Sequence, residues 1–209
     1  MYVGYMYGTS GSLANNRTNE NDSTIKIFID KWYEKNLLNN YDKFISKSAI
    51  YCNDRSINSS GKNFGAFSRT DALTPSYKCG EDGSGGLFES TQAIADKFSA
   101  STTGGGNGLL KYPVALMTLD EVDFAGDPSL NVWFNTNGDG ALNGGAWQLI
   151  SPTYVDRYVA YVEDKSTPNS ISALSHNVRP VISLNKCATI KSGNGTPESP
   201  YEIDETSCS

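Results

Sequence analysis

Apolar residues recur at helical spacing over one long stretch near the start of the chain. They are separated by three or four positions and share one helix face: Ile25, Phe28, Ile29, Trp32 and Tyr33. Polar residues 21–23 precede them and offer side chains that can cap a first turn. The pattern predicts a helix from about Ser23 to Leu38.

Short runs of alternating, β-branched or aromatic residues predict strands elsewhere. These runs are residues 1–8, 112–117, 146–151, 158–162 and 178–184. A second, short helix is expected directly after the run at 112–117. Thr118 and Glu121 have the spacing of a capping box there, and Gly126 can end the helix.

Residues 50–110 contain glycine clusters and no sustained period, so this stretch is predicted to be irregular, with a short helix at 90–100 as the alternative. Helices set apart from a mostly antiparallel sheet indicate an α+β protein. We expect residues 1–209 to form a single domain with two helices, short antiparallel sheets and long irregular loops. The first and last core strands, at 1–8 and 178–184, are expected to pair and bring the termini together.

The composition also favours loops and short strands. Hydrophobic residues make up 38% of the chain and charged residues 19%, both less than globular proteins ordinarily contain. A net charge of −6 without a basic run argues against nucleic acid as a partner. No apolar run approaches the ~20 residues that span a bilayer, so direct membrane insertion is not expected. The opening residues look like a strand rather than a signal peptide, which is typical of a mature piece of an exported protein.

The four cysteines bear on the cellular compartment. No two of Cys52, Cys79, Cys187 and Cys208 have Cys-x-x-Cys spacing, so a zinc or redox motif of that type is not predicted. Of the three possible pairings we favour the sequential one, Cys52–Cys79 and Cys187–Cys208. Each bridge then closes a loop of ~20–30 residues and is worth ~3 kcal/mol on the chain-entropy model. Disulfides predict a protein outside the cell or at its surface; four buried free thiols in a cytosolic protein are the alternative.

Several sequence blocks together resemble one family. Val178-Arg179-Pro180-Val181-Ile182, followed by a glycine turn and a second short strand, resembles the last core strand of bacterial C-type-lectin-like domains. The other blocks are similar to extracytoplasmic domains of gut Firmicutes: residues 2–8, 23–26, 30–33, 52–56, 112–114, 120–121, and Trp147 with 151–152. The resemblance implies a C-type-lectin-like fold. That fold includes formylglycine-generating enzymes, vertebrate lectins, bacterial adhesins and the variable proteins of diversity-generating retroelements.

The resemblance also implies where a ligand binds. In the variable proteins, the stretch before the last core strand carries the ligand-contacting residues, and residues 153–177 hold that place here. Tyrosine and arginine provide large contact areas with hydrogen-bonding ends, although an ordinary surface hairpin would also accommodate them. With the glycine-rich loop at 131–140, the candidate ligand-binding residues are Trp133, Asn135, Tyr154, Asp156, Arg157, Tyr158, Tyr161 and Asn169. The expected partner is a protein or a glycan, with no cofactor and no metal.

The sequence gives only weak signals for calcium binding and for Ser-His-Asp catalysis. Residues 135–140 begin like a calcium loop, but Ala146 stands where an EF-hand needs an acidic residue. His176 is the one histidine available to a Ser-His-Asp triad, and we expect it in a loop. We therefore expect a non-enzymatic ligand-binding domain of a secreted or surface-anchored protein. A pilin or adhesin head with a structural role is one alternative, and a formylglycine-generating-like enzyme, which needs a reactive cysteine pair, is another.

Three further predictions concern packing. Asp54 and Arg55 are expected to form a buried ion pair that organises the irregular middle of the chain. Trp32 and Trp147 are expected in the core, because one lies on the apolar helix face and the other in a strand. Arg179 is expected to pair with a carboxylate or to cap backbone carbonyls.

Overall fold

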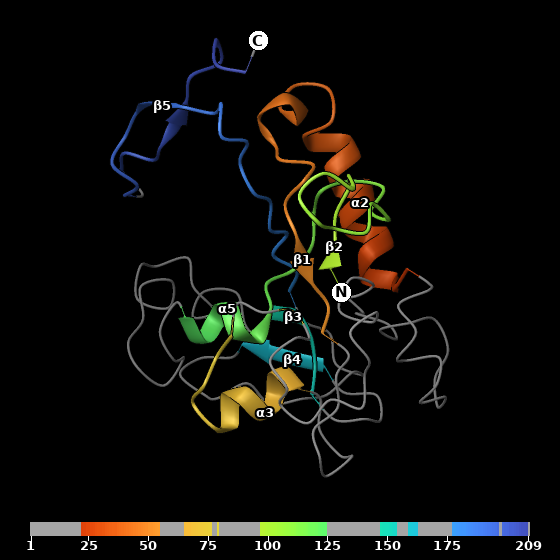
Figure 1. Ribbon diagram of the computed structural model, residues 1–209. Helices are drawn as coiled ribbons and strands as arrows, with labels where there is room; N and C mark the ends of the chain where they lie inside the picture. The colour runs from red at the N-terminus through yellow and green to blue at the C-terminus, as the bar shows by residue number, and fades with distance from the viewer. Residues whose placement is uncertain are drawn as a thin grey trace.

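The computed structural model of the protein describes residues 22–54, 65–76, 79, 97–124, 147–153, 159–162, 177–196 and 198–208 (Figure 1). Within these ranges the protein is mixed α+β, with three α-helices and three two-stranded antiparallel sheets. The predicted α+β class is confirmed, but the expectation of two helices is wrong. The predicted pairing of the strand at 1–8 with the last core strand concerns residues outside the described ranges.

Helix α2 (Thr24–Asn36) confirms the helix predicted from apolar spacing. It begins where expected, because the Ser23 side chain accepts a hydrogen bond from the Lys26 backbone N–H at 3.1 Å. Its inner face buries Ile29 and Tyr33. These two side chains pack with Ile45, Val114 and Leu116, and we call this group of five the α2 cluster; the predicted core residue Trp32 packs against it, half-buried.

Helix α5 (Leu119–Phe124) confirms the second predicted helix and its capping box. The Thr118 N–H donates to Glu121 Oε2 at 2.7 Å, and the Glu121 N–H donates to Thr118 Oγ1 at 3.1 Å. Leu119 and Val122 are fully buried in a second core group, the α5 cluster. Its members are Ala66, Leu119, Val122, Trp147, Leu149 and Ala160, so the core position predicted for Trp147 is confirmed.

Helix α3 (Gly65–Asp71) is the helix that the sequence pattern did not predict. It has seven residues, too few to show a helical period. Ala66 is buried in the α5 cluster, and α3 packs against α5 and the strand β3 (Trp147–Pro152). Figure 1 shows α3 and α5 beside the hairpin that β3 forms with β4 (Val159–Val162). Tertiary contacts rather than local pattern therefore hold this helix.

Strands β1 (Tyr51–Cys52) and β2 (Lys97–Phe98) pair antiparallel and give the irregular middle of the chain a small ordered base. Residues 97–98 form this strand, so the alternative of a helix over 90–100 is wrong at those two positions. Residues 90–96 lie outside the described ranges.

Residues 178–184, predicted as one core strand, do not form a regular strand. Together with Asn177 they pair one residue at a time with three parts of the protein. Asn177 bridges Trp147, Val181 bridges Ala115, and Leu184 bridges Ile45. Ala115 is also the one bridged residue in the predicted strand at 112–117. Pro180 has no N–H to donate, which fits an interrupted ladder. The segment connects the two core clusters instead of extending one sheet.

The chain ends in a small hairpin made of β5 (Ile190–Ser192) and β6 (Glu202–Ile203). Both predicted disulfides are present: Cys187–Cys208 closes this hairpin, and Cys52–Cys79 closes a loop that contains α3. No free cysteine remains. With sequence separations of 27 and 21 between the paired cysteines, each bridge contributes about 3.5 kcal/mol on the chain-entropy model.

Candidate functional site

Strands β3 (Trp147–Pro152) and β4 (Val159–Val162) form the antiparallel hairpin predicted on either side of the candidate binding residues. Trp147 pairs with Val162 and Gln148 pairs with Tyr161 at one end. Pro152 pairs with Val159 at the other end, with a change of register between the two ends. Residues 153–158, which connect the strands, are therefore flanked by the paired residues Pro152 and Val159.

Strand β3 is buried on both of its faces. Trp147 and Leu149 point into the α5 cluster, and Ile150 packs against the α2 cluster, as alternating side chains of a strand do. Gln148, 1% exposed, donates from its side-chain amide to the Ala160 carbonyl at 2.7 Å. This bond joins β3 to β4 in addition to their backbone pairing. A strand held in this way is a rigid support.

Both ends of the stretch 153–177 are attached to β3. Thr153, which follows the strand directly, is fully buried. At the other end, the Gln148 N–H donates to the Asn177 carbonyl at 3.0 Å, and Asn177 forms a parallel bridge with Trp147. Two residues later, the Arg179 guanidinium lies 5.1 Å from the centre of the Trp147 ring. The stretch 153–177, which the family resemblance implies as the ligand-binding region, therefore begins directly after the last residue of β3. Its last residue, Asn177, contacts the first two residues of β3.

Among the candidate ligand-binding residues, Tyr161 lies within the described part of the chain. It is in β4, opposite Gln148, and is 7% exposed. The other candidates are Trp133, Asn135, Tyr154, Asp156, Arg157, Tyr158 and Asn169, and they lie outside the described ranges. His176, residues 135–140 and Arg55 lie outside them too. The structure therefore describes the support of the candidate site.

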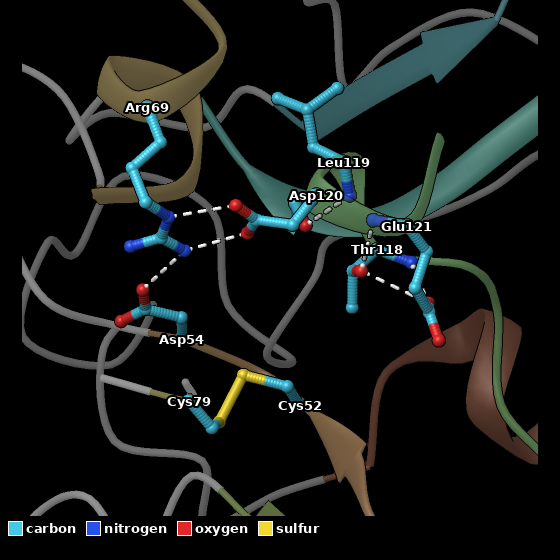
Figure 2. The surroundings of a disulfide bond; sticks show 9 residues. Cys52, Asp54, Arg69, Cys79, Thr118, Leu119, Asp120 and Glu121 are labelled. Carbon is cyan, nitrogen blue, oxygen red and sulfur yellow. Dashed lines mark hydrogen bonds and ion pairs between the residues drawn. A yellow bond between two sulfur atoms is a disulfide. The ribbon is translucent and has the colours of Figure 1, made fainter. Parts of the chain in front are cut away.

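A buried ion-pair network reinforces this support (Figure 2). The Arg69 side chain of α3 lies between two carboxylates, and all three residues are at most 6% exposed. Arg69 donates to both oxygens of Asp120 in α5, at 2.8 and 2.6 Å, in the bidentate geometry that suits a guanidinium. The same Nη2 atom that donates to Asp120 Oδ2 also lies 3.0 Å from Asp54 Oδ2. Asp120 also accepts the Ser76 backbone N–H at 2.9 Å.

The network bears on one prediction from the sequence. Asp54 does form a buried ion pair, with Arg69, whereas the predicted pair with Arg55 concerns a residue outside the described ranges. Arg69 and Asp54 both lie inside the loop that Cys52–Cys79 closes, whereas Asp120 lies outside it. The network therefore fastens a disulfide-bonded loop to the helix α5. Nothing in the sequence spacing pairs residues 69 and 120, which are 51 positions apart.

Two buried ionisable side chains lie in the α2 half of the protein. Burial raises the pKa of the Tyr51 hydroxyl, which stays protonated and donates to the Pro113 carbonyl at 2.8 Å while it accepts the Ser183 N–H at 3.3 Å. Burial also raises the pKa of Asp30, although a hydrogen bond from Lys26 acts in the opposite direction. Tyr51 connects separate segments of the fold directly, whereas Asp30 acts through Lys26, whose ammonium also donates to the Val114 carbonyl at 3.2 Å. Neither group adjoins a described catalytic partner.

Within the ranges that the structure describes, no cluster of three or more His, Cys, Asp or Glu side chains is placed to bind a metal ion. The carboxylates of Asp54 and Asp120 are engaged by Arg69. No helix in the described part of the chain is long and apolar enough to cross a membrane.

Comparisons of the chain with protein-family models, with curated protein sequences and with solved structures find no match. The resemblance to C-type-lectin-like domains therefore rests on the sequence blocks quoted above. What the structure adds is independent of that resemblance: a mixed α+β body, two disulfides, and a stretch of 25 residues whose two ends are attached to one buried strand.

Proposed function

We propose that the protein is a non-enzymatic ligand-binding domain with a C-type-lectin-like fold, belonging to a secreted or surface-anchored bacterial protein. Its binding face is formed by residues 153–177 with the loop at 131–140, and its ligand is a protein or a glycan. Tyr154, Asp156, Arg157 and Tyr158 provide the central contacts, because they lie between β3 and β4 in the sequence.

One observation carries the proposal: both ends of the stretch 153–177 are attached to the buried strand β3. The stretch includes β4, whose Ala160 belongs to the α5 cluster. Segments that connect strands tolerate sequence change better than the strands themselves, so we expect variation on either side of β4 rather than within it. A fixed base also lowers the entropy lost when the loop binds a partner. These properties suit a scaffold that displays variable side chains.

The two disulfides support the localisation part of the proposal. Disulfides form and persist in oxidising surroundings, which fits a secreted or extracellular protein. In addition, Cys187 and Cys208 are bonded to each other, so neither is a free thiol of the kind that a formylglycine-generating-like enzyme requires.

The first experiment separates display from structure. Replacing residues 154–158 with glycine and serine is expected to leave the melting temperature within about 4 °C of the parent, corresponding to ~1 kcal/mol or less. Truncating Leu149 to alanine is the matched control, because this buried side chain belongs to the α5 cluster and should cost about 2–5 kcal/mol. A loop replacement that unfolds the protein would show that residues 154–158 are part of the core.

The second experiment addresses binding itself. The protein, immobilised through its N-terminus, is screened against an oligosaccharide array and against purified surface proteins of cells from the same habitat. Alanine at Tyr154, Arg157 or Tyr158 should weaken the recovered interaction at least about tenfold, as expected for anchoring residues. Tyr41→Ala is the control, since that tyrosine is 45% exposed and lies beyond α2. Unchanged binding in all three variants, with a folded protein, would reject the site.

The genome offers a third test. A reverse transcriptase gene beside a near-repeat of the coding sequence for residues 131–180 is expected if the loop is diversified by a retroelement. Its absence would leave a fixed ligand-binding domain.

A further inference from the structure

The C-terminal hairpin has no hydrophobic core of its own. Every described residue from 185 to 208 is half-buried or exposed, including Ile190 and Tyr201, which are 59% and 60% exposed. Figure 1 shows this segment projecting from the rest of the protein, with β5 and the C-terminus far from the β3–β4 hairpin. An isolated two-stranded hairpin is marginally stable in water. The Cys187–Cys208 bond is therefore a principal source of its order.

Among the described residues, few hydrogen bonds attach the hairpin to the body. The Asn185 N–H donates to the Phe44 carbonyl at 2.7 Å, and the Lys43 ammonium donates to the Glu205 carbonyl at 2.9 Å. The second of these contacts is exposed to solvent. Because Glu205 lies near the disulfide in the sequence, this contact depends on the closed hairpin.

The two disulfides differ in their access to solvent. Cys79 is 4% exposed and its partner Cys52 is half-buried, in a strand that pairs with β2. Cys187 is exposed and Cys208 is half-buried. Attack on a disulfide requires a thiolate to reach one of its sulfur atoms, so the C-terminal bond is the more open to reduction.

The backbone at Cys208 adds a second difference. Its φ angle is 62°, in the left-handed region that non-glycine residues rarely adopt. Because Cys208 is crosslinked in this conformation, we expect the terminal residues to relax once the crosslink opens. Exposed or strained disulfides are the ones that are reduced first.

We propose that Cys187–Cys208 is a redox-sensitive clasp, which a dithiol reductant opens while Cys52–Cys79 remains closed. A thiolate of the reductant attacks Sγ of Cys187, forming a mixed disulfide and releasing Cys208 as a thiolate, which takes up a proton. The second thiol of the reductant then attacks the mixed disulfide, becomes oxidised to a disulfide, and frees Cys187. Two electrons pass from the dithiol to the protein.

Opening the clasp removes one specific surface. In the oxidised protein the Tyr201 ring lies against the backbone at Gly195, where an added Cβ would be 2.7 Å from ring atom Cε2. The ring is thus oriented by the turn yet largely exposed. After reduction residues 188–208 lose this arrangement, whereas the two core clusters keep theirs. The hairpin therefore presents Tyr201 in a fixed orientation under oxidising conditions only.

The test is a graded reduction of the intact protein with dithiothreitol, quenched with N-ethylmaleimide and followed by peptide mass spectrometry. Labelling of Cys187 and Cys208 should proceed at least about tenfold faster than labelling of Cys52 and Cys79. Amide signals of residues 188–206 in NMR spectra should collapse toward random-coil positions in the same samples. The near-ultraviolet circular dichroism of the core aromatic residues should be retained.

Paired variants test the structural half of the proposal without a reductant. The double variant Cys187→Ser with Cys208→Ser should lose the dispersed hairpin signals and keep a folded body. The matched variant, Cys52→Ser with Cys79→Ser, should keep the hairpin signals while it destabilises the body. Equal labelling rates, earlier labelling of Cys52 and Cys79, or an unchanged hairpin in the first variant would each overturn the proposal.

Discussion

Replacing Arg69 with methionine tests whether the buried network holds α3 and the disulfide-bonded loop to the body. Arg69 makes two hydrogen bonds to Asp120 and an ion pair with Asp54, and it is 4% exposed. Methionine fills similar space but leaves two buried carboxylates without this cation. Removing one partner of a buried pair costs about 3–5 kcal/mol, and because two carboxylates lose this cation the expected loss lies near the upper end.

The assay is urea unfolding with the disulfides intact, followed by fluorescence of the buried Trp147. A loss of about 5 kcal/mol would lower the melting temperature of a protein of this length by roughly 10–20 °C. Arg69→Lys keeps the charge but not the bidentate geometry, so it should lose less, about 2 kcal/mol. The denaturant slope must stay unchanged for these free energies to be compared.

A compensated variant shows whether charge is the cause. Combining Arg69→Met with Asp54→Asn and Asp120→Asn removes both carboxylates and keeps a side-chain oxygen to accept the Ser76 N–H. We expect this triple variant to recover most of the lost stability, because no uncompensated charge remains buried. A loss below about 1 kcal/mol in the single variant, or a triple variant no more stable than the single one, would refute the reasoning.

Three smaller predictions follow from other parts of the fold. Burial raises the pKa of Asp30 above 3.8. The raised pKa therefore contributes stability that is complete below 3.8 and is lost as pH rises through the folded-state pKa. In the variant Asp30→Asn, free energies of unfolding measured from acidic to neutral pH should not show this loss. Glu121→Ala removes the acceptor for the Thr118 N–H and should cost about 1 kcal/mol in denaturant unfolding, whereas no loss would show that the capping box is dispensable. Gly193→Ala places a Cβ 2.0 Å from the Pro200 carbonyl oxygen at a φ of +93°, so NMR should show a distorted hairpin and an unchanged body; an undisturbed hairpin would contradict this geometry.

Local patterns predicted much of the described fold correctly. The period of apolar residues gave helix α2, and the spacing of Thr118 and Glu121 gave the start of α5. The strands β3 and β4 were found from their β-branched and aromatic residues. Each of these signals depends on interactions within a few residues, which a sequence displays directly. The disulfide pairing was also correct, because pairing neighbours in the sequence closes short loops.

The support of the candidate site could be predicted in part. The two strands that flank residues 153–158 were expected, and so was the burial of Trp147. That Asn177 returns to the start of β3 was not expected, because the pattern at 178–184 indicated one regular strand. A pattern of apolar residues shows that a segment is partly buried, but it does not show which elements it contacts.

Helix α3 and the Arg69 network were decided by tertiary structure alone. Seven residues carry too little periodicity to identify a helix, and Arg69 pairs with a carboxylate 51 residues away. A buried guanidinium is stable only when folding brings carboxylates to it from other elements. Local hydrogen bonds and apolar periodicity involve residues close together in the sequence, so the sequence alone indicates them. A buried charge is compensated only in the folded protein, where distant segments come into contact.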